Sequence, residues 1–276
     1  MPWVPEQFTA PALQHLLDVR RQERFAAIPF FDGLLADEPD ALVESFAGEP
    51  ELYDPVRGRV KGEQAFREFV RETSTWLRER NVSVEDVEHV VLETRGFEEV
   101  LLHFDGETGR VDLPFAIVAD RLPGGEIDEL RLYYSSWPLA SRHTSRPPLL
   151  QRDPALHESD VVAEYQRALA AGDVEAVVAT FEPDGYAREP AGGHFVHRGS
   201  DDLRTFYTSL FSNGGGIPLE HCAVVDDGRA CALEYNVVRW GTTELPPQAG
   251  VAVYVRGTSG RLAAARVYDD AYPPLG

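Results

Sequence analysis

Three side chains in the second half of the chain are of the types that carry out acid–base chemistry. Tyr165 lies on the apolar stripe of an expected helix, Glu189 stands directly before Pro190, and Asp269 lies near the end of the last expected strand. A carboxylate can take or return a proton, and a buried phenol can donate a hydrogen bond to developing negative charge. Each residue also has a plainer interpretation: a core tyrosine, a turn before proline and an exposed acid.

The alternation of side chains along the last strand decides whether Asp269 can take part. In a strand, Ala265, Val267 and Asp269 share one face, whereas Arg266 and Tyr268 share the other. If the small apolar face is turned toward the core, Asp269 enters the same pocket as a second carboxylate. If it is turned outward, Asp269 is a solvated acid at a strand end.

Composition excludes several classes of partner. The 276 residues include 46 acidic and 26 basic side chains, which gives a formal net charge of -20. A surface this acidic repels phosphate backbones and anionic headgroups, so nucleic acid and membrane surfaces are not expected partners. The start of the chain has no signal-peptide pattern and no apolar run is long enough to span a bilayer, so a cytoplasmic protein is expected. Its two cysteines, Cys222 and Cys231, are expected to be reduced and buried.

An internal repeat covers most of the chain. Matched segments keep their order in both halves and their spacing drifts by only a few residues, which chance similarity does not explain. The repeat predicts an N-terminal helical extension at 1–25, a domain at 26–138, a linker at 139–156 and a second domain at 157–276. The matched segments are 41–46 with 176–181, Asp54-Pro55 with Glu189-Pro190, and 131–138 with 266–273.

The second copy has the pattern of three helices followed by a β-meander. Ser159, Asp173 and Ser200 are the expected N-caps of the three helices, and Gly172 is expected to end the first. A meander that curves around such helices leaves a cone with one apolar mouth, where a small molecule can bind. The expected strands span 217–226, 229–240, 248–257 and 261–271.

This order of elements resembles the nuclear-transport-factor-2-like fold, closely over 157–271 and more loosely over 26–138. Within it, 161–173, Arg188-Glu189-Pro190 and 203–207 are similar to segments of bacterial ketosteroid isomerases, and SnoaL-like polyketide cyclases share the scaffold. The resemblance implies an α+β class: two tandem cone-shaped α+β barrels, each with three helices on a curved antiparallel sheet. It also implies that the copies pair as an intramolecular pseudo-dimer, with a monomer and a homodimer both open as assemblies.

The resemblance implies roles for particular positions. The oxyanion-donor tyrosine of ketosteroid isomerases falls on Tyr165, the general-base carboxylate on Glu189 and the supporting tyrosine on Tyr207. The second oxyanion donor of that family, a protonated aspartate on the third strand, has no counterpart, because 248–256 contains no acid and Ala252 or a neighbour stands there. SnoaL-like cyclases use a carboxylate in the general region of Asp269.

Further residues complete the predicted pocket of the second copy and a secondary pocket in the first. In the first copy the base position survives as Asp54, Tyr134 stands at the position of Asp269, and Phe30 replaces the phenol donor Tyr165. We therefore expect the first copy to be a structural partner or a differently tuned pocket. Substrate-binding positions expected in the second copy are Phe181, Phe206, Cys231, Leu233, Tyr235 and Val267.

Neither a metal nor a cofactor is expected. His194 and His197 point in opposite directions in an extended segment, His221 is distant in sequence, and no zinc-type spacing occurs. Three functions remain open for a small apolar molecule in the second pocket. The first is an isomerase that moves a proton α to a carbonyl group, the second is an epoxide hydrolase or polyether-type cyclase with paired carboxylates, and the third is a binding protein without chemistry.

Overall fold

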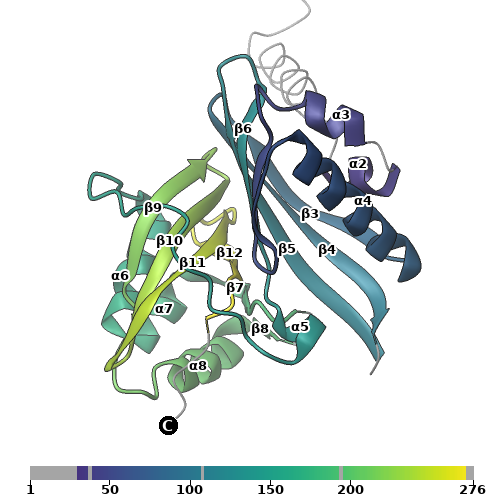
Figure 1. Ribbon diagram of the computed structural model, residues 1–276. Coiled ribbons are helices and arrows are strands. Elements are labelled where there is room, and N and C mark those ends of the chain that lie inside the picture. The colour runs from purple at the N-terminus through teal and green to yellow at the C-terminus, as the bar shows by residue number, and fades with distance from the viewer. Residues whose placement is uncertain (1–29, 37–38, 107–108, 193–194, 272–276) are drawn as a thin grey trace, which may run out of the picture.

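The computed structural model describes residues 30–36, 39–106, 109–192 and 195–271. The expected extension at 1–25 lies outside these residues. Each half of the chain places its helices on one face of a six-stranded sheet (Figure 1). The first half contains α2 (Phe30–Ala36), α3 (Pro39–Glu44), β1 (Glu51–Asp54), β2 (Gly58–Lys61), α4 (Glu63–Glu79), β3 (Ser83–Val91), β4 (Arg95–Gly106), β5 (Gly109–Arg121) and β6 (Ile127–Tyr133).

The second half repeats this order after a connecting segment. The segment holds α5 (Trp137–Ala140), a short helix that begins before the expected linker boundary at 139. The repeated elements are α6 (Asp160–Ala171), α7 (Val174–Ala179), β7 (Phe181–Arg188), β8 (Val196–Arg198), α8 (Gly199–Leu210), β9 (Leu219–Asp226), β10 (Ala230–Trp240), β11 (Thr243–Arg256) and β12 (Leu262–Tyr268).

Both sheets have the same topology, which supports the tandem duplication. Their strand orders are β2-β1-β6-β5-β4-β3 and β8-β7-β12-β11-β10-β9. Glu98 pairs with Ile117 in the first sheet and Leu233 pairs with Ala252 in the second, so equivalent positions are 135 residues apart in both strands. The β1–β6 and β7–β12 pairs are parallel, so each sheet is mixed and remains an open, curved layer with two edges.

Local signals explain where the helices of the second half begin and end. Gly172 adopts a left-handed conformation, with φ 69°, and ends α6, as the sequence predicts. Asp173 caps α7 by accepting a hydrogen bond from the backbone N–H of Ala176 at 3.0 Å. The expected cap at Ser200 is wrong, because α8 begins at Gly199 and Arg198 occupies the cap position. Ser159 stands at the N-cap of α6 without a side-chain capping bond.

One strand is longer than expected. β11 begins at Thr243, five residues before the expected start at 248, and so includes Pro246-Pro247, a pair that is uncommon inside strands. In the pairing with β10, Arg239 lies opposite Glu244 and Val237 opposite Gln248, so three residues of β11, 245–247, stand opposite one residue of β10. The irregularity accommodates two residues that have no N–H to donate, so the strand continues through them.

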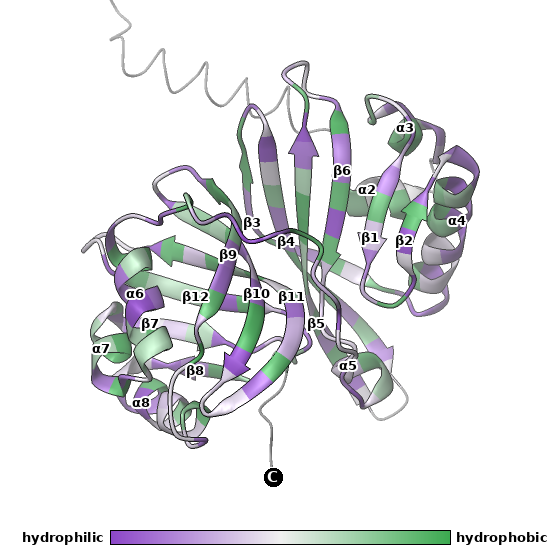
Figure 2. Ribbon diagram, turned by 60° about the vertical axis from the view of Figure 1, so that its left-hand side comes forward, coloured by the Kyte–Doolittle hydropathy of each residue, from purple (hydrophilic) through white to green (hydrophobic). Residues whose placement is uncertain are grey.

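The two halves pack sheet against sheet, with their helices on the outer faces (Figure 1). Hydrophobic and hydrophilic residues succeed one another along the strands in Figure 2, as expected when the two faces of a sheet have different neighbours. One apolar cluster joins the facing surfaces; it contains Val90, Phe97, Ala116, Val118 and Tyr133 of the first half and Val225, Ala230, Ala232, Ala249, Val251, Val253 and Tyr268 of the second.

Two buried ion pairs cross this interface in a symmetric way. The Nε atom of Arg131 lies 2.6 Å from Oε1 of Glu234, and the Nε atom of Arg266 lies 2.9 Å from Oε1 of Glu99. Each carboxylate also accepts a tyrosine hydroxyl, at 2.7 Å from Tyr133 and 2.5 Å from a residue at the equivalent position, Tyr268. Arg131 and Arg266 are matched positions of the sequence repeat, but their partners Glu234 and Glu99 were not predicted from the sequence.

None of the helices in the described part of the chain is long and apolar enough to cross a membrane.

We expect Glu99→Gln to destabilise the protein much more than Glu88→Gln. The first substitution leaves the buried guanidinium of Arg266 without its counter-charge, a change that costs about 3–5 kcal/mol in comparable buried pairs. Glu88 pairs with Arg229, whose side chain is 52% exposed, and such pairs are worth about 1 kcal/mol or less. Urea unfolding of both variants measures the difference, and equal losses would contradict the importance of the buried pair.

Candidate active site

The second domain encloses a cavity of about 320 Å³ between its helices and the concave face of its sheet. Four of the residues that the sequence analysis singled out as catalytic line it: Tyr165, Glu189, Tyr207 and Asp269. Most of its surface is apolar, which suits a small apolar ligand. Three of the expected substrate-binding residues also line it, namely Phe206, Tyr235 and Val267.

Tyr165 and Tyr207 form a hydrogen-bonded pair of phenols. Tyr165 comes from the apolar face of α6 and Tyr207 from α8, and their hydroxyl oxygens lie 2.8 Å apart. Burial raises the pKa of Tyr165 to about 12 and raises the pKa of Tyr207 well above its ordinary value. Both phenols are therefore protonated near neutral pH. Their mutual bond uses one of the two protons, and the other proton can be donated to a ligand.

Asp269 is a half-buried carboxyl group with a strongly shifted pKa. The face of β12 that carries Ala265, Val267 and Asp269 is the one that lines the cavity. Removal from water raises the pKa of Asp269 to about 6, and the hydroxyl of Tyr235, which donates to Oδ2 at 2.7 Å, opposes part of this rise. The carboxyl group thus changes its protonation state close to physiological pH.

Glu189 is arranged differently from Asp269. It follows β7 directly, its side chain is 33% exposed, and its Oε1 atom lies 2.7 Å from Nε2 of His197 on β8. The His197 ring stacks on Phe206, with centroids 4.1 Å apart and an interplanar angle of 9°. The pairing of β7 with β8 brings the two residues together, and this contact was not predicted from the sequence, where His197 was only a candidate metal ligand.

A further pair of polar side chains belongs to the inner end of the cavity. Tyr254 on β11 lines it, and Nε2 of Gln166 on α6 donates to the Tyr254 hydroxyl at 2.7 Å. Both side chains are buried. Neither residue was predicted from the sequence, although the resemblance to ketosteroid isomerases implies an oxyanion donor on the third strand of the meander. A neutral phenol therefore stands two residues from Ala252, in the strand where ketosteroid isomerases are expected to carry an acid.

Three of the expected substrate-binding residues do not line the cavity. Phe181, Cys231 and Leu233 are buried members of the apolar core and are absent from the cavity lining. Cys231 lies opposite Tyr254 in the sheet register, and the rings of Tyr254 and Tyr165 pack with centroids 5.2 Å apart. Leu233 lies opposite Ala252, which lines the cavity, but the Leu233 side chain itself is buried in the core.

The connecting segment supplies part of the cavity wall. Ser135, Trp137 and His143 line it, although they precede the second domain. The segment is tied to the end of β12 through Asp270, which accepts from the Ser135 hydroxyl at 2.6 Å and lies 2.9 Å from Nδ1 of His143. The rings of Trp137 and His143 stack with centroids 4.9 Å apart. From the sequence this segment was predicted only to be a linker, since its proline and arginine residues do not show the hydrophobic periodicity of a helix or a strand.

The equivalent position in the first domain is a cavity of about 240 Å³ that contains both predicted residues of the secondary pocket. Asp54 is buried, and its Oδ2 atom accepts the hydroxyl of Tyr134 at 3.0 Å. Its Oδ1 atom accepts the backbone N–H groups of Val56 and Arg57 at 2.8 and 2.7 Å. Asp54 thus closes a turn with one oxygen and holds a phenol with the other, which is a structural arrangement.

No cluster of three or more histidine, cysteine or acidic side chains suited to a metal ion occurs among the residues that the structure describes. His194 lies outside them. Cys222 is half-buried and Cys231 is buried, and both are free thiols.

We expect Tyr235→Phe to raise the pKa of Asp269 above about 6, because the lost hydrogen bond favours the ionised carboxylate. Tyr254→Phe is the matched control, since that hydroxyl bonds to Gln166. A ¹³C carboxyl titration by NMR measures both. The folded-state pKa lies above the ordinary value, so Asp269 should stabilise the fold below about pH 4, and this contribution should be lost as the pH rises through about 6. An unchanged pKa in Tyr235→Phe would contradict the assigned contact.

Comparisons with known proteins concern one domain at a time. None of the curated proteins compared with the chain matches it. One similar solved structure is that of SalBIII, an epoxide hydrolase/cyclase-like enzyme in pyran ring formation in the polyether salinomycin. Its sequence is 21% identical to this chain and the TM-score is 0.34. The aligned region covers 42% of this chain and 91% of the SalBIII chain. A SnoaL-like protein of unknown function from Burkholderia thailandensis is 16% identical, with a TM-score of 0.34. The aligned region covers 40% of this chain and 92% of the Burkholderia chain.

An NTF2-like protein of unknown function from Cytophaga hutchinsonii is 16% identical, with a TM-score of 0.33, and covers 42% of this chain and 95% of that chain. The sequence profile of the SnoaL-like domain family matches residues 162–265, a span that begins in α6 and ends in β12. The second half of the chain therefore carries a SnoaL-like domain.

Proposed function

We propose that the second-domain cavity catalyses proton transfer α to a carbonyl group of a small apolar substrate, as an isomerase does. One observation carries the proposal: Asp269, a carboxyl group with a pKa of about 6, lies in a mostly apolar cavity that also holds two protonated phenols. A general base is most effective when its pKa lies near the working pH. A phenol in a dry site stabilises an oxyanion more strongly than water-exposed donors do.

Asp269 fits the base better than Glu189, the residue that the resemblance to ketosteroid isomerases indicated. With a pKa of about 6, about nine-tenths of Asp269 is ionised at pH 7. Its Oδ2 atom accepts the Tyr235 hydroxyl at 2.7 Å and its Oδ1 atom accepts the backbone N–H of Ala271 at 3.2 Å, so the orientation of the carboxylate is fixed at both oxygens. Glu189 is more exposed and already engaged with His197, so it is suited to a second proton transfer near the mouth of the cavity.

The proposed reaction begins when the Asp269 carboxylate removes a proton from the carbon next to the substrate carbonyl. The electron pair moves onto the carbonyl oxygen, where the proton that is not shared between Tyr165 and Tyr207 forms a hydrogen bond. Protonated Asp269 then returns its proton to another carbon of the dienolate, which shifts the double bond. The apolar wall keeps water from quenching the intermediate.

A second candidate function, epoxide opening, is favoured by the presence of two carboxyl groups in one cavity. Protonated Asp269 would donate to the epoxide oxygen while Glu189, oriented by His197, would take the proton from the attacking hydroxyl group or water. The two candidates differ in their substrates: an enolisable ketone exchanges its α-protons in D₂O, whereas an epoxide is consumed without such exchange. A protein that only binds these molecules would do neither.

We expect Asp269→Asn to reduce turnover by about a hundredfold to ten-thousandfold, the contribution typical of general acid–base catalysis. Tyr165→Phe should reduce turnover by about a hundredfold or more through loss of an oxyanion donor. The assay is isomerisation of a β,γ-unsaturated cyclohexenone, followed by the absorbance of the conjugated product.

Asp54→Asn in the first-domain cavity is the matched control, because it changes the equivalent carboxylate that holds Tyr134. We expect it to leave turnover within about twofold. If Asp54→Asn abolished turnover while Asp269→Asn and Tyr165→Phe remained active, the chemistry would have been assigned to the wrong domain.

A further inference from the structure

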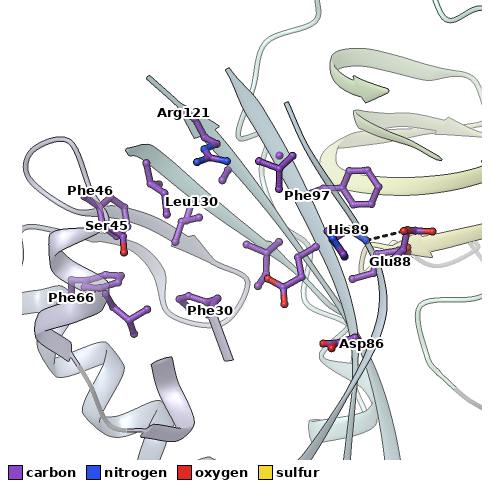
Figure 3. A pocket seen from close by; sticks show the side chains of 18 residues that line it. Phe30, Ser45, Phe46, Phe66, Asp86, Glu88, His89, Phe97, Arg121 and Leu130 are labelled. Atoms are coloured by element: carbon purple, nitrogen blue, oxygen red, sulfur yellow. Dashed lines mark hydrogen bonds between the residues drawn. The ribbon is translucent and has the colours of Figure 1, made fainter. Parts of the chain in front are cut away.

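A second cavity of the first domain, distinct from the one around Asp54, lies between the helices and strands β3 to β6, of which β3 is an edge strand of the sheet. It has a volume of about 240 Å³. Figure 3 shows Phe30, Phe46 and Phe66 on the helix side of this cavity, opposite the strands that carry Leu130 and Arg121. The aromatic and aliphatic side chains make its interior mostly apolar. We call it the edge cavity.

Comparison with the second domain explains the edge cavity, because the two domains have the same strand register and differ in the side chains at equivalent positions. Ala119 pairs with Leu130, and Tyr254 pairs with Ala265 at the corresponding place 135 residues later. In the second domain the Tyr254 ring fills the interior and contacts the Tyr165 ring. In the first domain a methyl group stands in place of that ring. The missing phenol leaves room in an otherwise repeated fold.

A second substitution acts in the same direction. Gly96 lines the edge cavity, and Cys231 is its counterpart in the second domain, where the thiol is fully buried in the core. No side chain extends inward from Gly96, so the space next to Ala119 is not refilled from the neighbouring strand. Both small residues lie on adjacent strands, since Gly96 pairs with Ala119 in the register of β4 and β5.

The charged groups around the edge cavity are engaged with protein partners. Glu99 binds Arg266, Glu88 binds Arg229, and the Arg121 side chain donates to the carbonyl oxygen of Gly125 at 2.6 Å. Asp86 and His89, both labelled in Figure 3, are exposed, and Glu98 also has a partner. Because these groups are satisfied or solvated, the interior favours a neutral ligand over an ion.

We propose that the edge cavity is a binding site for a neutral, apolar aromatic molecule of bicyclic size, such as naphthalene. An apolar cavity of about 150 Å³ is enough to bind benzene, so the larger edge cavity has room for a second fused ring. The edges of the surrounding phenylalanine rings offer the contacts that aromatic ligands prefer. This site is independent of the acid–base chemistry proposed for the second domain.

The four isoleucines of the chain provide a test that separates the two domains. Ile117 and Ile127 line the edge cavity, whereas Ile217 lines the cavity of the second domain. In protein labelled with ¹³C at the isoleucine δ1-methyl groups, we expect naphthalene to shift the signals of Ile117 and Ile127 in a saturable way. Shifts at Ile217 alone, or none at any of the three residues under saturated naphthalene, would overturn the proposal.

Ala119→Tyr copies the second-domain residue into the first domain and is the matched variant. It should abolish the saturable shifts at Ile117 and Ile127, while any response at Ile217 is retained. Ala119→Leu adds a smaller group and should weaken binding by about tenfold or more, which keeps the test valid if the tyrosine variant fails to fold. Unchanged naphthalene affinity at Ile117 in folded Ala119→Leu would place the ligand elsewhere and overturn the assignment.

Discussion

Two buried ion pairs, each between an arginine of one sheet and a glutamate of the other, constrain how the two domains pack. Arg131 with Glu234, and Arg266 with Glu99, occupy equivalent places in the two halves and are buried in an otherwise apolar interface. Such pairs add little net stability relative to apolar side chains, but a misaligned interface would leave charges unpaired and is therefore strongly disfavoured. They fix how the sheets face each other. In β12, the same alternation that turns Arg266 to the interface turns Asp269 into the cavity.

The duplication preserved the backbone and changed the chemistry. Sheet register is shared at an offset of 135 residues, yet the residue that directly follows the last strand is Tyr134 in one domain and Asp269 in the other. In the first domain the tyrosine holds Asp54, whose other oxygen closes a turn, so that carboxylate stabilises local structure. In the second domain the exchange to aspartate places a carboxyl group of raised pKa in the cavity. The connecting segment, tied to Asp270, completes that cavity from the first-domain side.

Much of this arrangement could be predicted from the sequence, because repeats and side-chain alternation are local patterns. The repeat predicted two similar domains, and the period of two in the last strand placed Asp269 on the face of Val267. Alternation gives the face of a strand but not which residues of that face reach the cavity, and Cys231 and Leu233, which were expected to bind substrate, are buried in the core. The contact of Glu189 with His197 depends on the pairing of two short strands, a tertiary feature without a sequence signature.

The pH dependence of kcat/KM for an enolisable ketone tests most directly whether Asp269 is a catalytic base. A base with a pKa of about 6 predicts that kcat/KM rises as the pH increases through about 6 and then levels off, because the ionised form is the active one. The residual activity of Asp269→Asn should lack this inflection. A profile that is flat between about pH 5 and 8, or the same inflection in Asp269→Asn, would contradict the account.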